Sequence, residues 1–364
     1  MMKNYSYLLL GSMLAAAVTS CSEDETVAVD LGHPIEFHTD MTSRAKGLTT
    51  ANLEEFWVYA YTDDGKEIMP ETKFTKDATS GDFVSEKKYY WPYKGTVNFV
   101  AYTKNEQSQA TLTPQEQQYK FNEGSECNDH YDFLSAKATG TKQENEKNGV
   151  ALKFSHRLAQ VELKVKSSND RYKIQVGRAS VNCIVRSNPI YNLTNDTWSI
   201  NPKGDNAYGI TLETPVAVTE EAKSLTADYG NFYIVPQKRT AWDNVSDPAN
   251  SQIGSLMIMY LQVRENGKLI IQPDDFVDAT GRFSSSSLSF EEGLAVQVWL
   301  PLDIDFEAGK KYTITVDFTD GLGYWGRSVP DQAGTPILGS PIKISSVEVE
   351  EWVDGDDLSV EPKE

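Results

Sequence analysis

The sequence has few of the residues from which metal sites and disulfide frameworks are built. It holds 3 cysteines and 4 histidines in 364 residues. The histidines (His33, His38, His130 and His156) are not spaced as a zinc pair on a helix, and no Cys-x-x-Cys is present. The sequence therefore predicts no metal site and no cofactor.

Signatures of catalysis are also missing. No glycine-rich phosphate loop, Gly-x-Ser-x-Gly elbow or kinase signature occurs in the chain. Carboxylates are abundant, with 53 Asp and Glu residues, so chance pairing is expected and their number does not indicate glycoside hydrolysis. We expect that the protein is not an enzyme.

Basic residues are in deficit. The chain has 34 Lys and Arg against 53 Asp and Glu, which gives a net charge of −19. A surface of this sign repels the phosphates of nucleic acids and the headgroups of anionic lipids. Nucleic acid is therefore excluded as a partner, and a membrane link must come from another feature of the chain.

Apolar runs long enough to span a bilayer are absent. The run Tyr7–Val18 has 12 residues, whereas a spanning helix needs roughly 20. Its length fits a secretory signal, so residues 1–20 are predicted to be a signal peptide. Val18-Thr19-Ser20-Cys21 resembles the lipobox of bacterial lipoproteins, with Cys21 as the acylated residue. The alternative is an ordinary signal peptide followed by an incidental cysteine.

The acidic residues after Cys21 fit display outside the cell. Ser22-Glu23-Asp24-Glu25 is similar to the tag that sends Bacteroidetes lipoproteins to the outer face of the outer membrane. A flexible, solvated spacer is a compatible interpretation. The sequence thus predicts a surface lipoprotein of the outer membrane.

Helical periodicity is nearly absent, and a period of two takes its place. In "YTITVDF", the apolar residues Tyr312, Ile314, Val316 and Phe318 share one face. Asn266-Gly267 between two such runs predicts a two-residue hairpin. The one helical candidate is residues 113–120. These patterns predict an all-β protein built from sandwiches or barrels.

A polar, unpatterned stretch at residues 141–149 predicts a domain junction near residue 148. The chain then divides into β-sandwiches at 45–147 and 148–364, although a loop inside one sandwich fits the same stretch. Cys127 and Cys183 either form a disulfide or stay as thiols, because the sequence does not test their separation.

An exposed arginine follows the first strand-like segment. Val27, Val29, Leu31, Ile35 and Phe37 are the apolar positions of this segment, and Thr42-Ser43-Arg44-Ala45 follows as a small polar linker. A flexible Arg bond of this kind is readily cut by proteases. The predicted cleavage site is Arg44-Ala45, and the alternative is an ordinary surface arginine.

Several longer stretches occur in a specific order. They are "KKYYWPYKGTVNFVAY" at 87–102, "YDFLSAKATGT" at 131–141, "VALKFSHRLAQVELKV" at 150–165, "FYIVPQ" at 232–237, "FEAGKKYTITVDF" at 306–318 and "ISSVEVEEWV" at 344–353. With Cys21 and Arg44, they make the chain resemble the fimbrillin family of Bacteroidia, the lipoprotein precursors of type V pili.

The resemblance implies two transthyretin-like β-sandwich domains in tandem. It also implies that an Arg-specific protease cuts after Arg44, so that the propeptide 21–44 leaves with its strand and its lipid. A strand from the C-terminal region of the next subunit then fills the groove. The candidate donor residues are Ile342, Ile344, Val347, Val349 and Trp352, with a slip at Ser345-Ser346 that suggests a β-bulge. Residues 344–353 equally fit the last strand of their own domain.

Two functions follow from these features. The first is a structural pilus subunit that supports adhesion, reaches the fimbrium after processing and polymerises by strand exchange. The second is a non-polymerising tip adhesin or lipid-anchored surface protein that binds a glycan or a host protein. Tyr89, Tyr90, Trp91 and Tyr93 are the aromatic residues that would contact a sugar, although core packing accounts for at least half of them.

Overall fold

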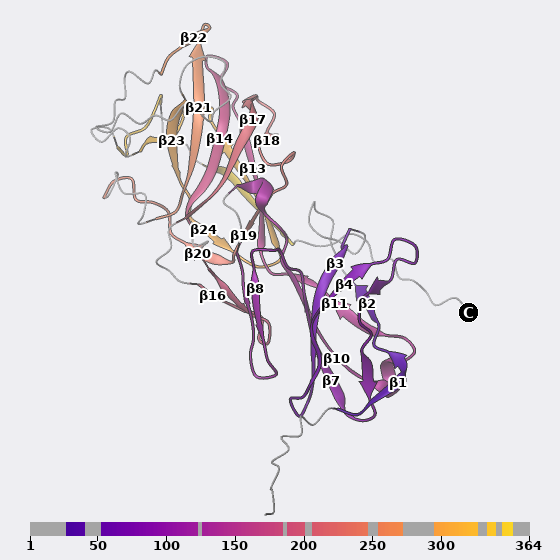
Figure 1. Cartoon of the computed structure of the whole chain (residues 1–364). Helices are drawn as coiled ribbons and strands as arrows, with labels where there is room; N and C mark the ends of the chain where they lie inside the picture. The colour runs from indigo at the N-terminus through magenta and orange to yellow at the C-terminus, as the bar shows by residue number, and fades with distance from the viewer. Residues whose placement is uncertain are drawn as a thin grey trace, which may run out of the picture.

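The structure is a computed structural model, and it describes residues 27–40, 52–122, 126–184, 188–200, 206–246, 254–271, 295–326, 333–339 and 344–351. The part of the chain so described consists of β-strands apart from one short α-helix, α1 (Lys142–Asn145), and one 3₁₀ turn, η1 (Cys127–Asp129). The predicted all-β class is confirmed. Figure 1 shows the strands gathered in two lobes, with β3, β4, β7 and β10 in one and β13, β14, β17 and β21 in the other.

The first lobe is built on one antiparallel sheet. Its strands lie in the order β12-β10-β7-β3-β4-β5. Their bounds are β3 (Glu55–Thr62), β4 (Glu67–Lys76), β5 (Phe83–Val84), β7 (Thr96–Tyr102), β10 (Leu134–Thr141) and β12 (Ser155–His156). Two short pairs complete the lobe: β1 (Val29–Pro34) with β6 (Tyr90–Pro92), and β2 (Phe37–Asp40) with β11 (Val150–Lys153). The apolar side chains between these layers form the first core.

The second lobe is a sandwich of two sheets. One sheet holds β13 (Ala159–Lys166), β18 (Lys223–Ser224), β19 (Phe232–Ile234), β25 (Lys310–Asp317) and β27 (Ile344–Glu351). The other holds β14 (Lys173–Ile184), β17 (Asn206–Ala217), β21 (Leu256–Glu265), β22 (Lys268–Leu269), β23 (Val296–Pro301) and β26 (Tyr324–Trp325). A separate pair joins β20 (Gln237–Arg239) to β24 (Ile304–Phe306). The second core lies between the two sheets.

Local sequence explains several of these elements. Tyr312, Ile314 and Val316 of β25 are buried in the second core, as their alternation predicts. Asn266 and Gly267 have φ of 48° and 81°, which is the left-handed pair that a type I′ turn requires, and β21 pairs with β22 across them. The predicted hairpin is therefore confirmed.

The end of β25 is fixed by a carboxylate. Asp317 Oδ1 accepts hydrogen bonds from the backbone N–H of Thr319 at 3.0 Å and from its hydroxyl at 2.5 Å. Lys166 Nζ lies 3.3 Å from Asp317 Oδ2 on the neighbouring strand. Burial alone raises the pKa of Asp317, but these hydrogen bonds and the lysine outweigh it, so the pKa lies below its ordinary value.

A four-stranded sheet contains strands from both halves of the sequence. The hairpin β8 (Gln109–Leu112) and β9 (Gln117–Lys120) pairs with β15 (Ile190–Asn192) and β16 (Thr197–Ser199), in the order β16-β15-β9-β8. Under this composite sheet lies a bridging cluster of aromatic and aliphatic side chains. Its buried members are Val100, Tyr102, Tyr119, Phe121, Phe133, Leu158, Tyr191, Leu193, Tyr233 and Val235. The composite sheet thus ties the two halves of the chain together.

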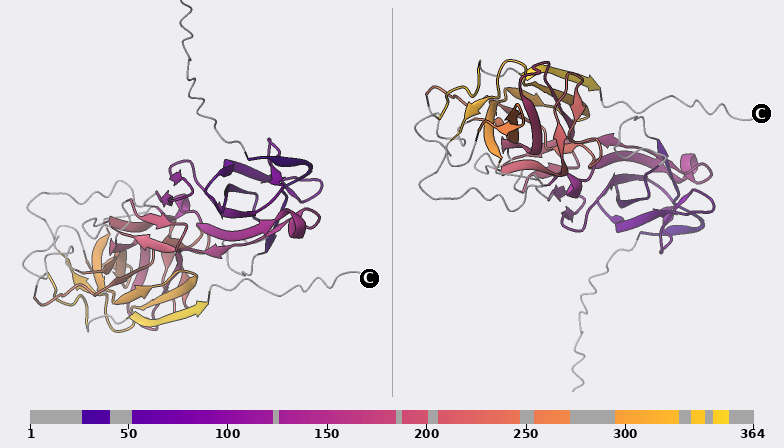
Figure 2. Two further views of the ribbon diagram at one scale, coloured as in Figure 1. Left: turned by 90° about the horizontal axis from the view of Figure 1, so that it is seen from below. Right: turned by 90° about the horizontal axis from the view of Figure 1, so that it is seen from above.

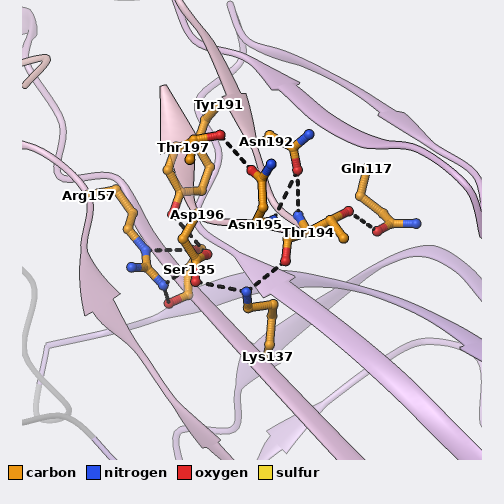
Figure 3. Close-up of polar contacts among 10 residues, drawn as sticks. All are labelled: Gln117, Ser135, Lys137, Arg157, Tyr191, Asn192, Thr194, Asn195, Asp196 and Thr197. Atoms are coloured by element: carbon orange, nitrogen blue, oxygen red, sulfur yellow. Dashed lines mark hydrogen bonds and ion pairs between the residues drawn. The ribbon is translucent and has the colours of Figure 1, made fainter. Parts of the chain in front are cut away.

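The tip of the β15–β16 hairpin is fixed on the first lobe by Asp196 (Figure 3). Its carboxylate accepts from Lys137 Nζ at 2.8 Å and from the Tyr191 hydroxyl at 3.0 Å, and it lies 3.4 Å from Arg157 Nη2. Arg157 in turn donates from Nε to Ser135 Oγ at 2.7 Å. Lys137 and Ser135 belong to β10, so the hairpin is attached to the sheet of the first lobe.

Two interpretations of the sequence need correction. The helical candidate at 113–120 is a turn followed by strand β9, because Tyr119 is buried in the bridging cluster and Gln117 to Lys120 pair with both β8 and β15. The polar stretch 141–149 contains α1 rather than an unpatterned loop, with Thr141 as its N-cap. Residues 117–120 form a strand because they pair with distant strands, and residues 142–145 form a helix that Thr141 caps.

The change from the first core to the second comes later than residue 148. Val150, Leu152 and Phe154 pack in the first core, and Ala159 is the first residue of β13 in the second core. Cys127 is a buried thiol whose Sγ donates to the carbonyl oxygen of Gly230 at 3.0 Å. The side chain of Cys183 lies outside the described residues.

Candidate functional site

The leading segment, residues 27–40, lies on the first lobe and is joined to the rest of the lobe by two separate strand pairings. β1 pairs with β6 in antiparallel fashion, and β2 pairs with β11 in parallel fashion. Between them, Ile35 N donates to Tyr89 O at 2.8 Å, and Val150 N donates to Glu36 O at 2.8 Å. The segment therefore belongs to none of the larger sheets and forms two separate two-stranded pairings.

Two of the five apolar side chains predicted for this segment fill the first core. Ile35 is 5% exposed and Phe37 is 4% exposed. The Phe37 ring makes edge-to-face contacts with Phe74, Phe99 and Phe56, at centroid distances of 5.0, 5.3 and 6.5 Å. Such contacts add to the stabilisation that burial alone supplies.

The other three apolar residues lie nearer the surface. Val27 and Val29 are half-buried, and Leu31 is 72% exposed. The predicted alternation along Val27, Val29 and Leu31 therefore does not place these side chains in the core. The core is filled by the short stretch from Ile35 to Phe37.

The turn between β10 and β11 holds the leading segment from outside. Lys142 Nζ forms an ion pair with Asp30, and His38 Nε2 donates to the carbonyl oxygen of Asn148. The hydrogen bond with Asp30 raises the pKa of Lys142. Gly149 has φ of 72°, and a Cβ there would lie 2.7 Å from His38 Nε2 and 3.0 Å from Glu36 O. Only glycine allows this close approach.

The predicted lipidation and cleavage residues, Cys21, Arg44 and Ala45, lie outside the described residues. The structure describes the leading segment up to Asp40 and the chain again from Asn52, and β3 begins at Glu55. The predicted cleavage site thus lies in sequence between the leading segment and the first strand of the large sheet.

The candidate donor strand lies in its own lobe. β27 pairs with β25 in antiparallel fashion and is the last strand in its sheet's order (Figure 2). Thr315 faces Ser346 and Val316 faces Ile344, so Ser345 is an extra residue and the predicted slip is confirmed as a bulge. Ile344 packs against the second core, whereas Val347 is 39% exposed. Ile342, Trp352 and the Val349 side chain lie outside the described residues.

The aromatic run at 89–93 offers little surface to a ligand. Trp91 is fully buried, with its ring edge-to-face on Phe99 at 5.9 Å. Tyr89 packs against the first core, and Lys87 Nζ lies 5.1 Å from its ring centroid. Tyr93 is 63% exposed. Trp91 therefore has a structural role.

Within the described ranges, no group of three or more His, Cys, Asp or Glu side chains is arranged to hold a metal ion. His156 Nδ1 of β12 lies 2.9 Å from Asp132 Oδ2 in a buried pair, with Asp132 in the segment that precedes β10. No helix among the described residues is long and apolar enough to cross a bilayer.

Comparison with solved structures gives the class of the fold. A fimbrial protein from Bacteroides vulgatus ATCC 8482 superimposes with a TM-score of 0.57 at 14% identity, over 88% of this chain and 99% of that chain. A candidate cell adhesion protein from Bacteroides uniformis ATCC 8492 gives 0.46 at 16% identity, over 88% and 97%. The fimbrial anchor protein Mfa2 of Porphyromonas gingivalis gives 0.39 at 12% identity, over 88% and 98%. At these identities, the first alignment establishes a shared fold.

The sequence comparison gives the family. A family model described as fimbrillin-like matches residues 43–352. The chain therefore belongs to the fimbrillin-like family. A search of curated proteins gives no significant match. Membership implies a place at the cell surface and association with other pilus subunits.

Sequence reasoning missed the turn that holds the leading segment. Lys142, Asn148 and Gly149 fall in a stretch whose polar composition suggested only a linker. Their role depends on contacts with residues more than one hundred positions earlier, such as Asp30 and His38. The sequence signal that exists is local: Gly149 directly precedes the apolar residue Val150, where the chain re-enters the first core.

Proposed function

We propose that the protein is a structural subunit of a type V pilus, exported as an outer-membrane surface lipoprotein with its lipid on Cys21. An Arg-specific protease cuts after Arg44, the leading segment leaves with its anchor, and subunits join by strand exchange. The observation that carries the proposal is that the leading segment fills the first core with Ile35 and Phe37 while belonging to none of the larger sheets.

The physical argument concerns what the segment leaves behind. Loss of Ile35 and Phe37 would open contact surface on Phe56, Phe74 and Phe99. Burial of two such side chains stabilises by about 1.5–3 kcal/mol each. The backbone of β11 would also lose its partner, and an extended segment from another chain can pair with such an edge. A free groove therefore favours association with another subunit.

A second function is supported by β27. This strand is paired with β25 along its length, so a chain that keeps it cannot donate it. A non-polymerising tip adhesin or lipid-anchored surface protein would keep this arrangement, and Tyr93 is the exposed aromatic side chain it would offer to a glycan or host protein.

The test uses purified precursor, residues 22–364, and a limiting dose of an Arg-specific protease. The product is run unboiled on a denaturing gel, and mass spectrometry gives its new N-terminus. A start at Ala45 with heat-sensitive oligomers supports the polymerising subunit, and R44A should abolish both. A start at Ala45 without oligomers supports the tip adhesin. An uncut Arg44 bond would overturn the processing model.

Deletion of residues 344–364 separates the two roles of the C-terminal strand. If β27 is the donor, the deleted chain is still cut after Arg44 but forms no oligomers by itself. When intact chain is added, the deleted chain should accept one donor strand into its groove and form a single junction, because it has no strand of its own to donate. If oligomers still form from the deleted chain alone, β27 is not the donor.

A further inference from the structure

Besides its backbone pairings with β6 and β11, the leading segment is held by two groups of contacts. Ile35 and Phe37 insert into the first core, where they contact residues of the large sheet. Asp30, Glu36 and His38 instead contact the turn formed by residues 141–150, which we call the clasp. The contacts of the first group are hydrophobic and buried. Those of the second group are polar and occur at two places, one on β1 and one at the start of β2.

Hydrogen bonds within the clasp stabilise its conformation, and they do not involve the leading segment. The Thr141 hydroxyl accepts from Glu144 N at 3.4 Å and donates to Glu144 Oε2 at 3.1 Å. Asn145 Oδ1 accepts from Thr141 N at 3.2 Å, and its Nδ2 donates to Gly149 O at 3.0 Å. A reciprocal cap of this kind fixes the first turn of a helix.

The clasp also sets the distance at which the segment passes. Gly149 has no Cβ, and a Cβ there would fall 3.0 Å from Glu36 O and 2.7 Å from His38 Nε2. The next residue, Val150, donates its N–H to Glu36 O at 2.8 Å and is itself buried in the first core. The clasp therefore connects directly to β11, the strand that pairs with β2.

We propose that the clasp retains the leading segment after the chain is cut, so that scission and release are separate steps. This inference rests on the proposed function only in taking scission between residues 40 and 52 as the event that precedes release. Release requires that the Asp30–Lys142 ion pair and the contacts of Glu36 and His38 open before Phe37 leaves its aromatic pocket. The clasp thus regulates when the groove becomes free for another subunit.

The ion pair makes this step sensitive to salt. The side chains of Lys142 and Asp30 are 29% and 25% exposed, so mobile ions reach them. Release should therefore quicken as ionic strength rises. The hydrophobic contacts of Ile35 and Phe37 do not weaken in this way, because salt screens charges and not apolar burial.

The experiment measures release of a labelled segment. The full precursor carries a fluorophore at its N-terminus and a recognition sequence for a highly specific protease inserted between residues 41 and 51. After complete cutting, fluorescence anisotropy follows the loss of the segment in the presence of excess unlabelled segment. We expect slow release from the otherwise unaltered chain, and release about two- to fivefold faster in K142A and in D30A.

A double-mutant cycle identifies the contact itself. D30A combined with K142A should accelerate release by less than the product of the two single effects, because both changes remove the Asp30–Lys142 ion pair, whereas the contacts of Asp30 with Gly32 and of Lys142 with Glu146 are each lost in one variant alone. K147A is the matched control, since Lys147 is an exposed lysine of the same clasp, and it should match the unaltered chain. G149A should release the segment at least tenfold faster, because its Cβ would displace Glu36 and His38.

Two outcomes would overturn the proposal. One is immediate loss of the segment from the unaltered chain once it is cut. The other is retention of the segment with equal release rates in K142A, D30A and K147A. Because the inserted site replaces Arg44 as the point of scission, failure of processing at Arg44 leaves this test intact, and the two hypotheses can fail independently.

Discussion

Phe37→Ala is the change that tests the candidate site most directly. The Phe37 ring is buried against three phenylalanine rings of the large sheet. Truncation of a packed phenylalanine to alanine costs about 3–5 kcal/mol. Because the leading segment forms its own short pairings, the change should lower the free energy that holds the segment on the first lobe. The stability of the second lobe should be unchanged.

Hydrogen exchange of the Val150 amide reports whether the leading segment is bound to the first lobe. This N–H donates to Glu36 O, so it is protected only while the leading segment is in place. A loss of about 3–5 kcal/mol in the free energy of local opening accelerates its exchange roughly 150- to 4,000-fold. Leu31→Ala is the control, because Leu31 lies on the same segment with 72% of its surface exposed, and should shift stability by no more than about 0.5 kcal/mol.

The pattern across other amides decides the interpretation. The amide of Ile35, which donates to Tyr89 O, should accelerate together with that of Val150, whereas amides of β14 in the second lobe should not. An unchanged Val150 rate in Phe37→Ala would refute the reasoning. Equal acceleration in both lobes would show that the segment opens only when the whole chain unfolds.

Three further predictions concern the stability of the uncut chain. Asp196→Asn should lower the free energy of unfolding by about 1.5–3 kcal/mol in urea titrations, because its carboxylate accepts charge-assisted hydrogen bonds that tie the composite sheet to β10; an unchanged midpoint would contradict that role. Asp317 has a lowered pKa in the fold, so its contribution is present above the unfolded-state pKa of about 3.9 and is lost as pH falls through the folded value. Asp317→Asn should therefore show a shallower stability loss below about pH 4 than the unaltered chain, and parallel acid profiles would argue against it. Ile344→Ala should cost about 1 kcal/mol or more by calorimetry, because Ile344 packs on the second core, whereas the exposed Val347→Ala should be nearly neutral; the reverse order would mean that β27 is paired differently.

Local sequence predicted the elements whose structure depends on their own residues. The alternation of Tyr312, Ile314 and Val316 predicted a strand whose apolar face packs in a core, although Thr313 and Thr315 on its other face are buried as well. Asn266-Gly267 predicted the hairpin between β21 and β22. The break in phase at Ser345 likewise predicted a bulge. In each case the signal lies within a few residues, so no knowledge of distant partners is needed.

The composite sheet could not be predicted in the same way. Residues 117–120 have a polar composition and one buried aromatic residue, Tyr119, which fits a helix turn as well as a strand. The pairing of β9 with β15 brings together residues about seventy positions apart, and nothing in either hairpin specifies the other. Register across such a distance is set by the bridging cluster and by Asp196, which are properties of the folded chain.

The site was predicted only in its apolar part. Ile35 and Phe37 stand out as a branched and an aromatic residue two positions apart, and both are buried. Val29 and Leu31 show the same spacing and are not in the core. Periodicity indicates which side chains share a face, but the presence of a covering layer decides which face is buried.

The composite sheet limits how modular this chain can be. A chimaera that takes residues up to about 156 from one relative and the remainder from another would combine β8 and β9 of the first with β15 and β16 of the second. The backbone ladder between β9 and β15 would survive such an exchange, but the side-chain contacts of Lys137 with Asp196 and of Gln117 with Thr194 at the incoming hairpin tip would not. A chimaera of two relatives should therefore fold when residues 190–199 come from the same relative as the first lobe. Substitutions in either hairpin should be accompanied by substitutions in the other.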